Sequence, residues 1–143
     1  MDNADKLLID TLFENGKTPL KELAAKVGLS APSTSERLKR LEERGVIKGY
    51  TLNVASDQIG YPLRAIVRVS PMPGQLQRVT KLIQQTAEIT ECDKVTGEDC
   101  FVCKIHLKSI EQLDLILDSI SQYAATNSSI IKSSPVKRRL PPL

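Results

Sequence analysis

The chain has 143 residues, of which 41% are hydrophobic and 26% charged, and its formal net charge is +3 at pH 7. This ordinary globular composition allows one sizeable core or two small ones. The longest apolar runs fall far short of the roughly 18–20 residues that a membrane-spanning helix needs, so no such helix is expected. The positive excess is too small to indicate a nucleic-acid partner, so any basic surface must come from the face that the charges occupy.

The N-terminus lacks the pattern of a signal peptide. The opening "MDNADKLLID" places acids where a basic region would stand and contains no apolar stretch of the required length. The chain has three cysteines, an odd number that does not form a closed disulfide framework. We therefore expect a cytoplasmic protein.

The first half of the chain predicts two helices in succession. Apolar spacing indicates a helix over residues 4–14 that stops at Gly16. A second helix opens with Thr18 as the N-cap and Pro19 at the first helical position, and it ends at Gly28.

A third helix follows after a very short turn, with Ser30 as its N-cap and Gly45 at its end. The segment 45–54, "GVIKGYTLNV", then predicts a short hairpin with Lys48 at its tip. Three helices, a tight turn between the last two and a hairpin directly after them are typical of a winged helix-turn-helix domain.

The third helix has a core stripe of Thr34, Leu38 and Leu41 and an opposite face rich in charged and hydroxyl side chains. Such a face on an isolated helix is usually a solvated surface with pairs of charges four residues apart. The short turn and the expected hairpin favour major-groove DNA instead, because Arg and Lys read guanine edges or hold phosphates. The predicted DNA-binding residues are Ser30, Ser33, Ser35, Glu36, Arg37, Lys39, Arg40 and Lys48.

The second half predicts a ferredoxin-like βαββαβ domain, which gives an α+β fold class overall. Pro135 confines the last strand to an edge or a bulge, and Ser109 caps the second helix of this half. We expect the helix-turn-helix domain over 1–54, a linker over 55–61 and the ferredoxin-like domain over 62–143. The expected elements are strands at 62–70, 90–97, 100–107 and 128–140, with helices at 74–89 and 109–123.

The stretch "VTGEDCFVCKI" contains a C-x-x-C, formed by Cys100 and Cys103, with His106 just beyond it. Side chains along a strand alternate between faces, so the two sulfurs point to opposite sides and do not converge on a metal or a disulfide. Only Cys92 is left as a further ligand, and a zinc site needs four. The sequence therefore predicts buried cysteines, no metal site and no cofactor.

The turn before this strand, Gly97-Glu98-Asp99, has two interpretations. Gly97 permits an unusual backbone angle, and the amides and carboxylates exposed at such a corner can hold the ammonium and carboxylate of an amino acid. Alternatively, the three residues are merely a good hairpin turn.

At this point the chain resembles a known family. "LKELAAKVGLSAPSTSERLKRLEERGVIKGYT" resembles the DNA-binding domain of the Lrp/AsnC (feast/famine) transcriptional regulators, and "VTGEDCFVCKI" resembles their motif V-x-G-D/E-x-D-Y/F. The resemblance implies a RAM domain that binds amino-acid effectors at a subunit interface. It also implies dimers that assemble further, commonly to octamers. The effector-binding residues that it implies are Gly97, Glu98, Asp99, Cys100 and Phe101.

We interpret the sequence as a sequence-specific DNA-binding transcriptional regulator that binds double-stranded DNA and a small-molecule effector, with an amino acid as the expected class. The alternative is an architectural DNA-binding protein without an effector. An enzyme is not expected, since no catalytic triad, phosphate loop or metal-spacing motif is present. A four-stranded sheet with helices on one side leaves an open face, to which Ile66, Val102 and Ile131 are expected to contribute and which favours a homo-oligomer.

Overall fold

A computed structural model describes all residues, 1–143. The chain divides into two compact units, one of Met1–Asn53 with Val136–Leu143 and the other of Val54–Pro135. The predicted domain boundary at 61/62 stays a prediction. The last eight residues of the chain belong to the same compact unit as the N-terminal helices. None of the helices has the length and apolar content needed to cross a membrane.

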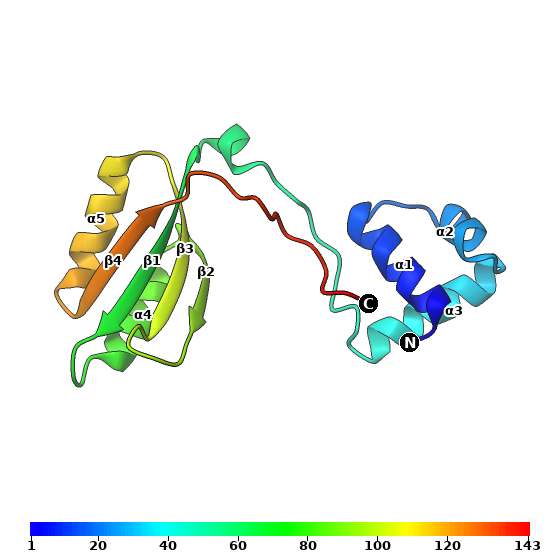
Figure 1. The fold of residues 1–143 in the computed structure, drawn as a ribbon, viewed down its shortest axis with the longest axis horizontal. Coiled ribbons are helices and arrows are strands. Elements are labelled where there is room, and N and C mark those ends of the chain that lie inside the picture. Colours follow the sequence, from blue (N-terminus) through cyan, green and yellow to red (C-terminus); the bar gives the residue numbers. More distant parts are fainter. The chain divides into compact units, whose positions relative to one another are not determined.

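The N-terminal unit consists of α1 (Asn3–Glu14), α2 (Leu20–Val27) and α3 (Ala31–Glu43), which confirms the three predicted helices (Figure 1). Asp2 caps α1: its carboxylate accepts from the Asp5 N–H at 2.9 Å, and the Asp5 carboxylate accepts from the Asp2 N–H at 3.3 Å. This reciprocal pair satisfies two donors that a helix start leaves unpaired.

The predicted N-cap of α2 was wrong. Thr18 lies one residue too early, and Pro19 occupies the cap position without a side-chain hydrogen bond. The Thr18 hydroxyl donates instead to the Asn15 carbonyl at 2.7 Å. The hydroxyl is therefore engaged in the preceding turn and does not reach α2.

The turn between α2 and α3 agrees with its prediction. Gly28 ends α2 with a φ of 67°, a left-handed conformation that favours glycine. Ser30 then caps α3, since its Oγ accepts from the Ser33 N–H at 3.2 Å. Thr34 and Leu41 anchor α3 in the small core of this unit with Leu8 and Leu23, and all four are buried.

The predicted hairpin over 45–54 does not form, and no strand lies between α3 and the sheet of the second unit. The N–H groups of Val46 and Ile47 both donate to the Leu41 carbonyl, so the chain folds back on the end of α3. Val46, Tyr50, Leu52 and Val54 stay exposed. A hairpin here would bury no apolar face, and an isolated two-stranded hairpin is marginal in water.

The tail of the chain contacts α1 in the N-terminal unit. The Arg138 guanidinium lies over the Phe13 ring, 5.2 Å from its centroid. This cation–π contact helps to hold the basic tail against the first three helices, with which it forms one compact unit.

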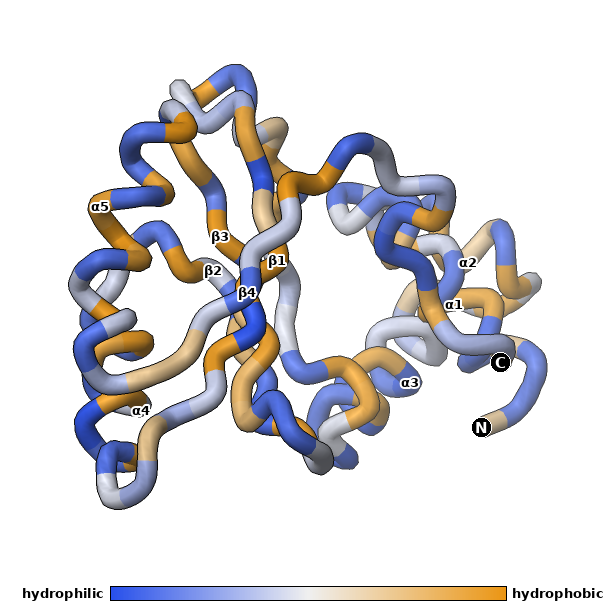
Figure 2. The backbone as a smooth tube through the Cα atoms, turned by 60° about the vertical axis from the view of Figure 1, so that its left-hand side comes forward, coloured by the Kyte–Doolittle hydropathy of each residue, from blue (hydrophilic) through white to orange (hydrophobic).

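The second unit is a four-stranded antiparallel sheet in the order β2-β3-β1-β4, with two helices on one of its faces (Figures 1 and 2). This arrangement confirms the predicted ferredoxin-like fold. Ser109 caps α5 as predicted. The elements are β1 (Leu63–Pro71), α4 (Leu76–Gln85), β2 (Ile89–Lys94), β3 (Phe101–Leu107), α5 (Ile110–Ser121) and β4 (Ala124–Ile130).

The last strand was predicted at 128–140 and lies earlier, at Ala124–Ile130. It pairs with β1 and forms an edge of the sheet, as expected, but Pro135 is outside it. The strand begins almost directly after α5, because Ala124 reaches the core there and is buried. Its outer half is rich in Ser and Asn, which a propensity argument assigns to loops.

Side chains of β1 and β3 alternate between two faces of the sheet. The helix-covered face contains the core, in which Val67, Cys103 and Ile105 are among the buried residues. Figure 2 shows that hydrophobic and hydrophilic residues are interspersed along α5, as in a helix that packs one side on a core. Ile66 and Val102 lie on the open face, as predicted, and the Ile131 N–H extends the ladder by donating to the Arg64 carbonyl at 2.8 Å.

Candidate DNA-binding helix and effector turn

Helix α3 presents its predicted polar face to solvent. Lys39 and Arg40 are about two-thirds exposed, and each pairs within the helix, Lys39 with Glu43 at 3.7 Å and Arg40 with Glu36 at 3.5 Å. Exposed pairs of this kind are weak, about 0.3–0.5 kcal/mol each. Both cations are therefore available to a phosphate or a base edge at little cost.

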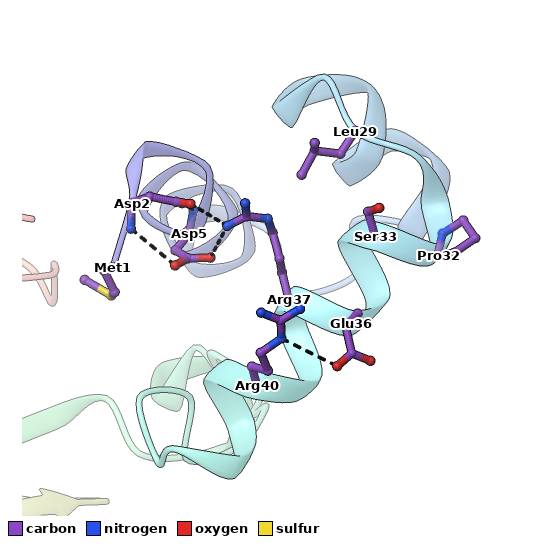
Figure 3. A pocket seen from close by; sticks show the side chains of 9 residues that line it. All are labelled: Met1, Asp2, Asp5, Leu29, Pro32, Ser33, Glu36, Arg37 and Arg40. Carbon is purple, nitrogen blue, oxygen red and sulfur yellow. Dashed lines mark hydrogen bonds and ion pairs between the residues drawn. The ribbon is translucent and has the colours of Figure 1, made fainter.

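Arg37 differs from its neighbours on the same helix. Its Nη1 lies 2.7 Å from Asp2 Oδ2 and 3.0 Å from Asp5 Oδ1, so α3 is tied to the start of α1 (Figure 3). The hydrogen bonds that Arg37 donates to Asp2 and then to Asp5 raise the pKa of Arg37. The pKa of Asp2 is lowered, first by the backbone N–H of Asp5 and then by Arg37.

A groove of about 680 Å³ runs along this junction of α1 and α3. Figure 3 shows Arg37 reaching across it toward α1 while Arg40 turns toward Glu36. The groove belongs to the same surface as the predicted DNA-binding residues. Its lining consists of Met1, Asp2, Asp5, Leu29, Pro32, Ser33, Glu36, Arg37 and Arg40.

The remaining predicted DNA-binding residues are placed less uniformly. Ser33 and Ser35 are exposed in the first turns of α3, while the Ser30 hydroxyl is engaged as the cap. Lys48 is exposed, but it lies in the irregular segment after α3 and not at the tip of a hairpin.

The turn 97–99 connects β2 to β3 and is attached to the end of β1. Gly97 has a φ of 106°, the unusual angle expected there. The Ser70 hydroxyl lies 3.3 Å from both the Glu98 carbonyl and Asp99 Oδ1. Arg68 Nε lies 3.9 Å from Asp99 Oδ2, with both side chains between 40% and 50% exposed. The turn thus places a carboxylate, a guanidinium and a hydroxyl side by side.

The two residues after the turn do not share this exposure. Phe101 opens β3 on the helix-covered face and is 5% exposed, within the core. Cys100 is half-buried, and its carbonyl accepts from the Val95 N–H at 2.8 Å, which closes the turn. The ring of Phe101 therefore packs in the core and is not exposed at the surface of the turn.

The C-x-x-C makes no metal site. Cys103 is buried on the helix side, and His106 lies on the opposite face, where its ring accepts or donates a hydrogen bond at 2.9 Å with Thr90. Burial, then the positive charges of Arg64 and Lys104, lower the pKa of His106. No group of three His, Cys, Asp or Glu side chains is placed to hold a metal ion.

Sequence reasoning missed the partners that hold these residues. Asp2 and Asp5 engage Arg37, and Arg68 and Ser70 hold the turn. The alternation of β1 carried a signal for the last two, because it places Arg68 and Ser70 on the open face at the end nearest the turn. Nothing local signalled the contact between the first helix and the third.

Two family models match the chain in the same order as its two units. The model described as winged helix-turn-helix DNA-binding matches residues 1–48, and the model described as the Lrp/AsnC ligand binding domain matches residues 64–141. The chain belongs to the Lrp/AsnC family. It is therefore a DNA-binding transcriptional regulator and not an enzyme.

Relatives of the Lrp/AsnC family match over nearly the whole chain. The HTH-type transcriptional regulator LrpC of Bacillus subtilis is 32% identical over 133 residues, which cover 93% of this chain and 92% of LrpC. The solved structure of LrpC matches with a TM-score of 0.90 at 31% identity, over 96% of this chain and 99% of that one. A feast or famine regulatory protein from M. tuberculosis, solved in complex with L-methionine, matches with a TM-score of 0.87 at 30% identity over 97% of each chain.

Proposed function

We propose that this Lrp/AsnC regulator binds double-stranded DNA through α3 and responds to an amino acid, or a related metabolite, held at the turn 97–99. The observation that carries the proposal is that one chain has both an exposed polar face on α3 and a turn that presents both signs of charge. In this proposal, as in the sequence-based prediction, residues 1–54 bind DNA and residues 62–143 bind the effector.

On the DNA side, Lys39 and Arg40 are the proposed contacts of α3, with Ser33, Ser35 and Glu36 on the same face. Lys48 adds a cation just after the helix. Arg37 has a different proposed role: through its pairs with Asp2 and Asp5 it fixes the orientation of α3 on α1. Ser30 contributes through the start of the helix, where the positive end of the helix dipole favours a phosphate.

On the effector side, the chemistry of an amino acid complements the turn. Its ammonium suits the Asp99 carboxylate, and its carboxylate suits the Arg68 guanidinium, which lies 3.9 Å away and is only loosely paired. Glu98 and the backbone at Gly97 offer further polar groups, with Cys100 behind them. The complex of the M. tuberculosis relative with L-methionine supports this class of ligand.

The open face of the sheet is the proposed surface between two subunits. Ile66, Val102 and Ile131 are its proposed apolar contacts, and the register places charged residues such as Lys104 and Arg68 next to them. A two-fold dimer places two copies of α3 on DNA half-sites about one helical turn apart. Further assembly of dimers adds DNA-binding surfaces to one particle. We expect the protein to act in the cytoplasm.

The test is a thermal-shift panel of the twenty amino acids, each at millimolar concentration, with the purified full chain. A ligand at 100 times its Kd adds about 2.7 kcal/mol to the native state, which shifts the melting temperature by several degrees. We expect one amino acid or a few related ones to do so.

The Asp99→Asn variant should lose the shift, because it removes the charge that pairs with the ammonium. Asp114→Asn, which removes an exposed carboxylate from α5 of the same unit, should keep it. If the whole panel is silent with protein that still binds DNA, the amino-acid proposal fails, which favours the architectural alternative or an effector outside the amino acids.

A further inference from the structure

Cys92 and Cys103 face each other across neighbouring strands. They are register partners of β2 and β3, and the Cys103 S–H donates to Cys92 Sγ at 3.3 Å. The pair is not the C-x-x-C of the sequence, whose other cysteine, Cys100, precedes β3. Two thiols in contact on paired strands need only a small movement of their side chains to react with one another.

The position of the pair in the ladder also suits a covalent link. The Val95 N–H donates to the Cys100 carbonyl, so these two residues form a hydrogen-bonded pair. Hydrogen-bonded and non-hydrogen-bonded pairs alternate in an antiparallel ladder, and Cys92–Cys103 is three pairs further along. It is therefore a non-hydrogen-bonded pair, in which the Cα atoms lie about 4.5 Å apart, within the range of disulfides.

The two thiols differ in their environment. Cys103 has no exposed surface and belongs to the core, and burial, followed by its hydrogen bond with Cys92, raises the pKa of its thiol to about 12. Cys92 is half-buried at the edge of that core, on the outer strand of the sheet. A small oxidant dissolved in water therefore reaches Cys92 first.

We propose that Cys92 and Cys103 are an oxidisable dithiol, which a hydroperoxide converts to a disulfide across β2 and β3. The Cys92 sulfur attacks the peroxide oxygen, the O–O bond breaks, and Cys92 becomes a sulfenic acid while the peroxide leaves as an alcohol or water. The Cys103 sulfur then attacks the Cys92 sulfur and displaces hydroxide, which takes the Cys103 proton and leaves as water. In total two thiols lose two electrons and two protons, and the peroxide is reduced.

The link would close the base of the hairpin that carries the turn 97–99. Only residues 93–102 lie between the two cysteines, so oxidation restricts the motion of that turn. Excess dithiothreitol reverses the step by thiol–disulfide exchange. This modification stands independently of the proposed effector, because its chemistry needs no ligand.

The experiment treats the reduced full chain with hydrogen peroxide, unfolds it in iodoacetamide and measures its mass. The three free thiols should fall to one, and the oxidised chain should lose two hydrogens without forming a disulfide-linked dimer. Trypsin cuts after Lys94 and Lys104, so the peptides 82–94 and 95–104 should appear as one linked species that dithiothreitol separates.

Variants assign the link. Cys100→Ser should keep it, and Cys92→Ser, at the half-buried position, should abolish it without loss of the fold. The oxidised wild type should melt several degrees above the reduced protein, and oxidised Cys92→Ser should not. A link that disappears in Cys100→Ser, a link between chains, or Cys92 oxidised to sulfinic acid with Cys103 still alkylated would each overturn the proposal.

Discussion

At the scale of single residues, identical side chains on one helix have different roles. Arg37 and Arg40 are three positions apart on α3, but Arg37 is held by two carboxylates at the start of α1 and Arg40 by one exposed glutamate. The sequence predicted both as DNA-binding residues, because helical periodicity gives the face of a residue and not its partner. Asp2 lies 35 positions from Arg37, and only the packed structure brings them together.

Asp2→Asn tests this ion pair through its dependence on pH. The pKa of Asp2 is lowered from an ordinary value of 3.8, so its charge stabilises the fold above that value, and the stabilisation is lost as the pH falls through the folded pKa. Asparagine keeps the cap, because its amide oxygen still accepts from the Asp5 N–H.

We therefore expect the variant to melt a few degrees below the wild type at pH 7, with the difference shrinking from pH 5 to pH 3. Circular dichroism melts across that range provide the measurement. Asp10→Asn, at an exposed position of α1, is the matched control. An equal flattening of the pH dependence in the control would contradict the role assigned to Asp2.

The cysteines show the same limit on sequence reasoning. Alternation was expected to place Cys100 and Cys103 on opposite faces of one strand, but Cys100 precedes β3 and packs against the core that contains Cys103. The pairing of Cys92 with Cys103 depends on the register of the hairpin. A turn centred between Gly97 and Glu98 gives that pair, whereas a turn centred on Glu98 pairs Cys92 with Lys104. A slip of one residue reverses the face of every side chain, and turn composition alone does not decide it.

At the scale of elements, prediction worked where a local signal and a buried face agreed. Gly28, Ser30 and Ser109 end or begin helices as expected, because caps depend on neighbouring backbone groups. The segment 45–54 has the alternation of a hairpin, but it has no third strand or helix to cover it. The last strand was placed too late, because pairing with β1, and not propensity, fixes Ala124–Ile130.

Helix α3 yields a prediction about DNA. Lys39→Gln with Arg40→Gln should weaken binding to duplex DNA and make it less dependent on salt. The slope of log K against log salt should fall by about 0.9 for each phosphate that these side chains neutralise in the wild type. The exposed pairs that these changes remove contribute little to stability. Fluorescence anisotropy across a series of salt concentrations measures both the affinity and the slope.

Lys81→Gln is the control for α3, since it removes an exposed positive charge from α4 in the second unit. Its salt slope should match that of the wild type. Were it to lower the slope as much as the α3 changes do, the binding would follow overall charge, and the DNA-binding role proposed for α3 would be wrong.

At the scale of the whole molecule, one face of the sheet is covered by helices and the other is open. Helices α4 and α5 cover one side and complete the core of the unit. On the other side, Ile66 pairs with Lys104 of β3 and Ser129 of β4, with no helix above it. Lys104 and Glu91 form an exposed ion pair at 3.6 Å on this side. An apolar centre with charges of both signs around it suits a two-fold surface, on which each residue meets its partner's complement.

Ile66→Asp should therefore separate the subunits. A carboxylate in the interface loses its water, and Lys104 opposite it, which is already paired with Glu91, offsets only part of that cost. The remaining cost of about 3 kcal/mol or more weakens dimerisation at least about a hundredfold. Size-exclusion chromatography with light scattering should show monomers at micromolar concentration, with the circular dichroism of the fold unchanged. Leu115→Asp makes the same chemical change at a position of α5 that is 72% exposed, and it should leave the dimer intact.

Two outcomes of this experiment carry further conclusions. Dimers that persist in Ile66→Asp would mean that the subunits meet on another surface. If Ile66→Asp gives monomers that still bind single half-sites, the sheet sets the spacing between two α3 helices and each N-terminal unit binds DNA without it.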